Sequence, residues 1–236
     1  MLRAIKNDCR LNAKDWLLYP AFVIGGFLFG LILTFLVMRS NDPESWFPLA
    51  SLFAILGGFF CALLYDSIAF LPRYQIALSM GCTRKPLIAA QFLLCAAKMA
   101  ACALLTLPLL YLDLAIYRRF YAVWPVELDL LPYFRTPWLL LYLLTPPCFS
   151  LLISGVIGKF GRRGGGVLYF IFLFCCIGLP RIAKGAEQNP DGWVARFFAA
   201  CAALPAALWI SAGAILLLLV LLFSIRAMMT IRVELS

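Results

Sequence analysis

The sequence contains no histidine among its 236 residues. Serine hydrolases with a histidine base, histidine-ligated metalloproteases and enzymes that transfer phosphate through histidine all need an imidazole side chain. The absence of histidine therefore excludes these three classes. Aspartyl or thiol catalysis inside a membrane needs no imidazole, but no pair of carboxylates stands within an apolar stretch. We therefore expect a protein that is not an enzyme and has no catalytic residues.

Charged residues are scarce as well. Lys, Arg, Asp and Glu make up 13% of the chain and hydrophobic residues 64%, and the mean hydropathy is +0.96. A typical soluble domain contains about 25% charged and about 45–50% apolar residues. The longest polar stretches, about 20 residues, are too short to bury a core of their own. This composition predicts a single transmembrane domain over residues 1–236 and no nucleic-acid partner.

Motifs for metals and nucleotides are also missing. Nine cysteines are present, but no spacing matches a zinc site, and Cys175 and Cys176 are adjacent in the chain. We expect the cysteines to pack as small hydrophobic side chains without disulfides. The glycine-rich GRRGGG (161–166) lacks the lysine and hydroxyl pair of a phosphate loop. It predicts a tight turn, and we expect no ATP site, cofactor or metal on this chain.

The chain does contain six apolar runs. A membrane-spanning helix needs about 20 apolar residues. The six runs predict an all-α polytopic membrane protein with six transmembrane helices and both termini on one side. They lie at about 16–38, 47–69, 87–112, 138–158, 165–180 and 206–225.

The distribution of basic residues predicts which side carries the termini. Of the 20 Lys and Arg residues, twelve fall on the side of the termini and seven in the opposite loops, while Lys98 lies within a span. Basic residues are enriched in cytoplasmic segments. Both termini are therefore predicted to be cytoplasmic, and the net charge of +9 to face the lipid of the inner leaflet.

Between the second and third runs, residues 73–80 (RYQIALSM) predict a short helix. Pro72 discourages continuation of the second span, Gly81 suits a left-handed cap, and Thr83 with Pro86 suits the start of a new helix. At helical spacing, two apolar pairs point to nearly opposite sides, with a polar strip of Gln75 and Ser79 between them. The pairs are Tyr74 with Leu78 and Ile76 with Met80. We expect one pair to face the spans and the other a cytoplasmic partner, although a capped connection without a partner is the alternative.

The string ALSMGCTRK (77–85) resembles the cytoplasmic loop between spans two and three of bacterial type-2 ABC exporter permeases. The resemblance implies that residues 73–80 form a coupling helix that docks on a separate ATPase subunit. By position, the docking residues would be Tyr74, Gln75, Ile76, Leu78, Ser79 and Met80, flanked by Arg84 and Lys85. Many relatives have a glutamate before this helix, whereas this chain reads LPRYQ, so no ion pair is expected there.

The resemblance also implies partners and a mechanism. Two ATPase subunits would close on ATP and switch the access of a permease pair, whose second member is identical or similar to this chain. The route would run between the permeases, lined by spans one, two and five, in the bacterial cytoplasmic membrane. Amphiphilic, peptide or lipid-like substrates are plausible because such molecules enter from the leaflet.

Two further segments leave alternatives open. Residues 1–15 place Leu2, Ile5 and Cys9 near one helical face, which favours an amphipathic interfacial helix over a simple basic flank. For the segment before Pro205, one interpretation is a long last span that starts near Phe197, and the other is a short re-entrant or interfacial helix over 192–204 followed by a span at 206–225. Similar permeases have an external hairpin here, and we adopt the second interpretation.

Lys98 lies about 16 Å into the third span. A cation at that depth should face protein or water, as a pore-lining or gating charge, or snorkel to the inner surface. Asp66 is its possible partner, but the span limits place the two at depths that differ by about 12 Å, which argues against a direct pair.

A second functional class remains open: an ion- or proton-coupled carrier or a membrane assembly protein without an ATPase. A proton carrier is expected to place acidic residues at mid-membrane, and only Asp66 comes near that position. The chain shows no internal repeat of the kind many carriers have.

Overall fold

The computed structural model describes residues 13–40, 47–120, 130–134, 137–188 and 192–231. Every regular element within these ranges is helical, which confirms the all-α class. Five helical stretches are long and apolar enough to cross a membrane, so the chain has the character of a multi-pass membrane protein. They are Asp15–Val37, Leu49–Ser79, Arg84–Phe120, Trp138–Gly185 and Ala206–Thr230. Most of the helix expected over 1–15 lies outside the described residues.

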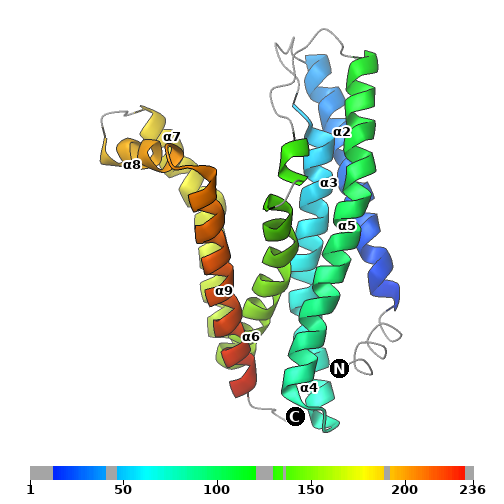
Figure 1. Cartoon of the computed structure of the whole chain (residues 1–236), viewed down its shortest axis with the longest axis vertical. Helices are drawn as coiled ribbons and strands as arrows, with labels where there is room; N and C mark the ends of the chain where they lie inside the picture. The colour runs from blue at the N-terminus through cyan, green and yellow to red at the C-terminus, as the bar shows by residue number, and fades with distance from the viewer. Residues whose placement is uncertain (1–12, 41–46, 121–129, 135–136, 189–191, 232–236) are drawn as a thin grey trace.

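Helix α2 (Ala13–Ser40) packs along α3 (Leu49–Phe60), which continues without a break through a π-helical turn, η1 (Cys61–Tyr65), into α4 (Asp66–Ser79) (Figure 1). The predicted helix boundary at Pro72 is therefore wrong, because Pro72 lies inside α4. A proline within a helix costs about 3 kcal/mol or more. Phe70 and Tyr74, buried on either side of Pro72, hold the helix together by tertiary packing that local sequence signals do not reveal.

Helix α5 (Arg84–Phe120) returns along α4 after a short turn. Gly81 has φ +81°, as predicted for a left-handed cap. The Gly81 N–H donates to the Leu78 carbonyl and the Cys82 N–H to the Ala77 carbonyl, both at 3.0 Å. This pair of bonds is a Schellman motif, which ends a helix with its last carbonyls satisfied. We call the end of the molecule that carries this turn the turn end.

The short η2 (Leu131–Phe134) leads to α6 (Trp138–Leu173), which contains a reversal at Gly161 (φ 57°, ψ −139°). A Cβ on Gly164 would lie 2.7 Å from the carbonyl oxygen of Val156. Residues eight apart in a straight helix are about 12 Å apart, so this proximity requires the chain to fold back. The reversal falls at the first residue of the predicted turn over 161–166. After it the chain passes through η3 (Phe174–Gly178) into α7 (Leu179–Gln188).

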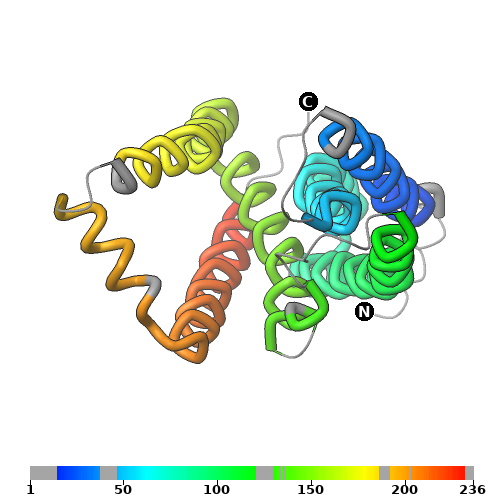
Figure 2. Tube along the Cα trace, turned by 90° about the horizontal axis from the view of Figure 1, so that it is seen from above, coloured from blue at the N-terminus to red at the C-terminus, as the bar shows by residue number. Residues whose placement is uncertain are grey.

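The remaining helices are α8 (Trp193–Ala202) and α9 (Ala206–Thr230), separated at Pro205 as in the interpretation with a distinct helix over 192–204. Helix α9 packs on α6. Figure 1 shows α7 and α8 far from the turn end, and Figure 2 shows the second part of α6 with α7, α8 and α9 to one side of the α2–α5 bundle.

Two buried clusters hold these parts together. The first joins α2, α3, η1 and α5 and includes Tyr19, Val23, Phe27, Cys95 and Met99. The second lies at the turn end, where α4, α5, α6 and α9 meet, and contains Phe70, Tyr74, Ile88, Leu151, Met228 and Ile231. The start of α2 and the end of α9 both reach the turn end, through an Asp15–Arg73 ion pair and a Tyr74–Met228 hydrogen bond.

Helices α2 and α3 approach so closely that only glycine fits at their contact. A Cβ on Gly57 would lie 2.5 Å from the Phe22 carbonyl oxygen, and one on Gly30 would lie 2.5 Å from the Cα of Ala50. A Cβ on Gly26 would collide with the Phe53 carbonyl oxygen, whereas one on Gly25 would meet nothing within 4 Å. Small residues of this kind allow helices to pack by van der Waals contact in lipid.

We expect Gly26→Ala to destabilise the protein by about 1–3 kcal/mol, because the added methyl group must push two backbones apart. Gly25→Ala, one residue away in the same helix, is the matched control and should leave stability unchanged or slightly raised. Thermal unfolding of the purified protein in detergent measures both variants. Equal melting temperatures for the two would contradict the proposed contact.

Candidate functional site

A buried ion pair joins α5 to α4. The Lys98 Nζ lies 3.0 Å from the Asp66 Oδ1, and the two side chains are 6% and 1% exposed. The Tyr19 ring of α2 covers the ammonium group, with its centroid 5.0 Å from Nζ. Three helices thus contribute one side chain each to a site that is closed to solvent.

The register of the α4–α5 hairpin explains why these two residues meet. Asp66 stands thirteen residues before Ser79, and Lys98 stands fourteen residues after Arg84. Both therefore lie about 20 Å from the turn. The 12 Å difference in depth expected from the sequence is wrong, because the second helix does not end near residue 69 but continues to Ser79.

The π-helical turn η1 ends at the residue before Asp66. A π-turn adds one residue to a helical turn, so it changes the direction of every side chain that follows, and such turns are frequent at functional sites. The Ser67 hydroxyl donates to the Leu63 carbonyl within this region. The Ser154 hydroxyl of α6 donates to the Ser67 carbonyl at 2.9 Å. The ion pair is therefore linked to α6 as well as to α2.

Two polar atoms at this site, the Asp66 Oδ2 and the Tyr19 hydroxyl oxygen, lie close to each other but make no hydrogen bond of normal geometry among the described residues. An unmade hydrogen bond of a buried group costs about 1–3 kcal/mol. The carboxylate thus uses only part of its acceptor capacity, and the phenol adds a further donor nearby. Within the described residues, no three cysteine or acidic side chains come together as metal ligands.

A second polar cluster lies near the start of α2. Asp15 accepts hydrogen bonds from the Tyr65 hydroxyl and from the Arg73 guanidinium, both at 2.7 Å. The sequence patterns of residues 1–15, a basic flank or an amphipathic helix, did not reveal this cluster. An acidic residue at the start of one span, opposite a basic residue at the end of the next, was the available signal.

A third polar contact lies at the opposite end of the bundle. Asp113 accepts hydrogen bonds from the Ser51 N–H at 3.0 Å and the Ser51 hydroxyl at 2.6 Å. The predicted third span ended at residue 112 and would leave Asp113 in a loop; this bound is wrong, because α5 continues to Phe120 and buries the Asp113 carboxylate. These bonds join α3 to α5 far from the turn end.

At the turn end, the two apolar pairs of residues 73–80 face different surroundings, as predicted. Tyr74 is 1% exposed, and Leu78 packs beside it in the second buried cluster. Ile76 is 58% exposed and Met80 is 76% exposed. The helical segment therefore has one face fixed to the protein and one free apolar face.

The polar residues of the same segment divide in a similar way. Gln75 is half-buried, while Ser79 is exposed and donates its hydroxyl proton to the Ile76 carbonyl at 2.7 Å.

Two side chains of the hairpin bind the end of α9. The Arg84 guanidinium donates to the Met229 carbonyl at 2.6 Å, and the Tyr74 hydroxyl donates to the Met228 carbonyl at 3.0 Å. Both acceptors belong to the last turn of α9, whose carbonyls have no partner within the helix. Tyr74 and Arg84 thus tie the hairpin to α9, while Lys85 is exposed.

Comparison of the chain with protein-family models, with curated proteins and with solved structures finds no match.

We expect Asp66→Asn or Lys98→Met alone to destabilise the protein by about 3–5 kcal/mol, because each leaves one buried charge without its partner. The double variant should recover most of this loss, since it removes both charges together. Thermal unfolding of the four proteins in detergent gives the coupling energy. A double variant as unstable as the worse single variant would show that the pair does not act as a unit.

Proposed function

We propose that this chain is the membrane-spanning permease subunit of an ATP-driven exporter, with its ATPase on a separate polypeptide. Two permeases, identical or similar, would stand above two ATPase subunits and move an amphiphilic, peptide or lipid-like substrate by alternating access. The observation that carries the proposal is the exposed apolar face of Ile76 and Met80 on a segment whose other face is fixed to the protein.

This face would lie outside the bilayer. The continuous helix Leu49–Ser79 has 31 residues and is about 46 Å long, whereas the hydrocarbon core is about 30 Å thick. About ten residues of this helix must therefore extend beyond the hydrocarbon. Arg73, Arg84 and Lys85 at the turn end favour extension on the side of the headgroups and the cytoplasm.

The contacts of the hairpin support a lever. The Schellman turn joins α4 to α5 rigidly, Tyr74 and Arg84 hold α9, and Arg73 holds α2 through Asp15. About 20 Å deeper, the Lys98–Asp66 pair connects the same hairpin to Tyr19. A force applied to Ile76 and Met80 by a docked ATPase would reach α5 through the turn, and α2 and α9 through these ion pairs and hydrogen bonds.

Six crossings follow if the chain crosses once on each side of Gly161. The apolar stretch Trp138–Gly185 has 48 residues, which is about 72 Å of helix and more than twice the hydrocarbon thickness. The reversal at Gly161 divides it into two arms, each long enough for one crossing. This count puts both ends of the described chain in the cytoplasm and α8 on the outside.

The orientation predicts which thiols an impermeant reagent can reach in intact cells. Cys82 is exposed in the α4–α5 turn and should be labelled only after the cells are permeabilised. A cysteine introduced as Trp193→Cys in α8, at a side chain that is 81% exposed, should be labelled without permeabilisation. Mass spectrometry of the two peptides reads both sites, and labelling of Cys82 in intact cells would reverse the orientation.

Docking is tested with the double variant Ile76→Asp and Met80→Asp. Both side chains are exposed, so the variant should insert and fold, while recovery of ATPase activity with the purified permease should fall at least tenfold. Phe160→Asp, at a side chain 52% exposed beside the Gly161 reversal, is the control for an added charge at another turn. Unchanged ATPase recovery with the folded double variant would count against docking at this face.

A second candidate function, an ion- or proton-coupled carrier, is favoured by one observation. Asp66 is an ionisable group deep in the helices, and Lys98 holds only one of its two carboxylate oxygens, in a site that Tyr19 also lines. Ionisable residues at such depth commonly mark ion or proton routes. Transport that continues without ATP and stops when the proton gradient is dissipated would favour this function over the exporter.

A further inference from the structure

We propose that the groove between α5, α6 and α9 binds an anionic phospholipid of the surrounding membrane, with an acyl chain along the groove and the headgroup phosphate at Lys85. The inference concerns lipid binding by this chain alone and does not depend on the exporter proposal.

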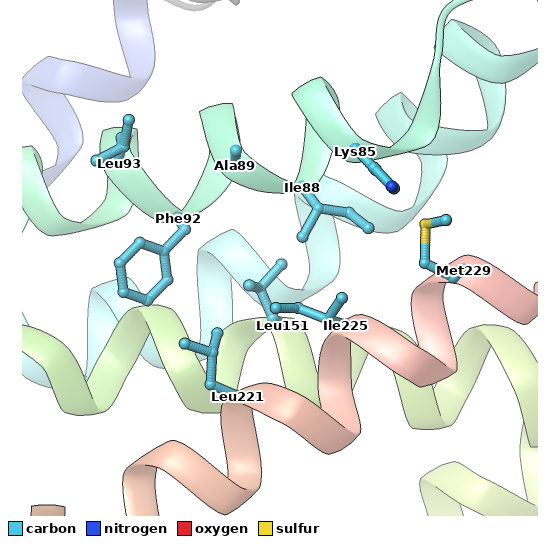
Figure 3. A pocket seen from close by; sticks show the side chains of 9 residues that line it. All are labelled: Lys85, Ile88, Ala89, Phe92, Leu93, Leu151, Leu221, Ile225 and Met229. Atoms are coloured by element: carbon cyan, nitrogen blue, oxygen red, sulfur yellow. The ribbon is translucent and has the colours of Figure 1, made fainter.

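The groove begins at the turn end as a hollow of about 480 Å³. Lys85 and Met229 face each other at its mouth, and Phe92 and Leu221 line its deeper end (Figure 3). Leu151 of α6, which is fully buried, lines the hollow between α5 and α9. On α9, the lining residues Leu221, Ile225 and Met229 recur every four positions, so one stripe of that helix faces the hollow.

A second hollow of about 310 Å³ continues in the same direction and shares Phe92 and Leu221 with the first. It ends near Pro137 and Ile210. From Met229 to Ile210 the groove follows α9 for nineteen residues, or about 29 Å, which matches the thickness of the hydrocarbon core. The groove thus extends across both leaflets, and one acyl chain would occupy about half of its length.

The lining explains why hydrocarbon fits and water does not. Apart from Lys85, every side chain that lines the two hollows is apolar. Apolar hollows do not hold ordered water, because water needs several polar partners. Leu93 and Ile225 remain 45% and 37% exposed, so the groove is open to the side and a membrane lipid can enter it directly.

The charge at the mouth selects the headgroup. Lys85 is exposed, and no acidic side chain forms an ion pair with it within the described ranges. Lys85 also lies in the first turn of α5, where the positive end of the helix dipole adds to its charge. A lipid phosphate at the headgroup level would pair with the Lys85 ammonium group and interact favourably with the dipole of α5. The acyl chain of the same molecule would cover Ile88 and Phe92.

The test uses the full-length purified protein and native mass spectrometry with two lipids that have the same acyl chains, phosphatidylglycerol and phosphatidylcholine. Two variants change the site: Lys85→Gln removes the charge, and Ala89→Phe fills the hollow. Each has a matched control. Arg226→Gln removes an exposed basic charge near the same end of α9, and Ala101→Phe enlarges an exposed position of α5 outside the groove.

We expect the wild type to retain phosphatidylglycerol at least tenfold more than phosphatidylcholine. Lys85→Gln should abolish this preference, and Ala89→Phe should lower retention of both lipids at least fivefold. The two controls should behave as the wild type. Thermal unfolding accompanies each variant, and because Lys85 is exposed its variant should fold.

Three outcomes would overturn the proposal. The first is equal retention of the two lipids by the wild type, and the second is a preference that survives Lys85→Gln. The third is lipid retention unaffected by Ala89→Phe while the same change converts a dimer to a monomer, which would identify a second copy of the chain as the occupant. None of these outcomes depends on an ATPase, so they are separate from a failure of the exporter proposal.

Discussion

The Lys98–Asp66 ion pair is the interaction on which the arrangement of the bundle depends. Two charges taken into a membrane interior are costly unless they meet each other. Their separation of 3.0 Å requires α4 and α5 to remain in one register, and Tyr19 then closes the site from α2. A shift of either helix by one turn would separate the charges by about 5 Å and leave both without compensation.

The same register positions the turn end. Because α4 and α5 are aligned at the ion pair, the turn that joins them buries Tyr74 and exposes Ile76. The last carbonyls of α9 find their donors on this hairpin. The ion pair, the turn and the end of α9 therefore form one connected unit, and a partner that moves the turn would act on all of it.

The side of the molecule beyond α6 is built differently. Helix α9 is held to the hairpin at the turn end, whereas α7 and α8 lie at the other end, away from the α2–α5 bundle. The apolar groove follows this division, since α5 supplies one wall and α9 the other. Lipid in the groove would fill the space between two parts of the protein that are joined mainly at one end.

The sequence by itself determined the all-α class, the apolar helices, the Gly81 cap and the two faces of residues 73–80, because each follows from local composition and helical spacing. It did not reveal that α4 passes through Pro72, that α5 buries Asp113, or that Asp15 pairs with Arg73. These depend on packing between segments far apart in the chain. The sequence offered Asp66 only as a possible partner of Lys98, and tertiary structure decided the pair. Packing around Tyr74 carries α4 through Pro72 to the turn at Gly81, so Asp66 and Lys98 lie at equal distances from the turn that both helices share.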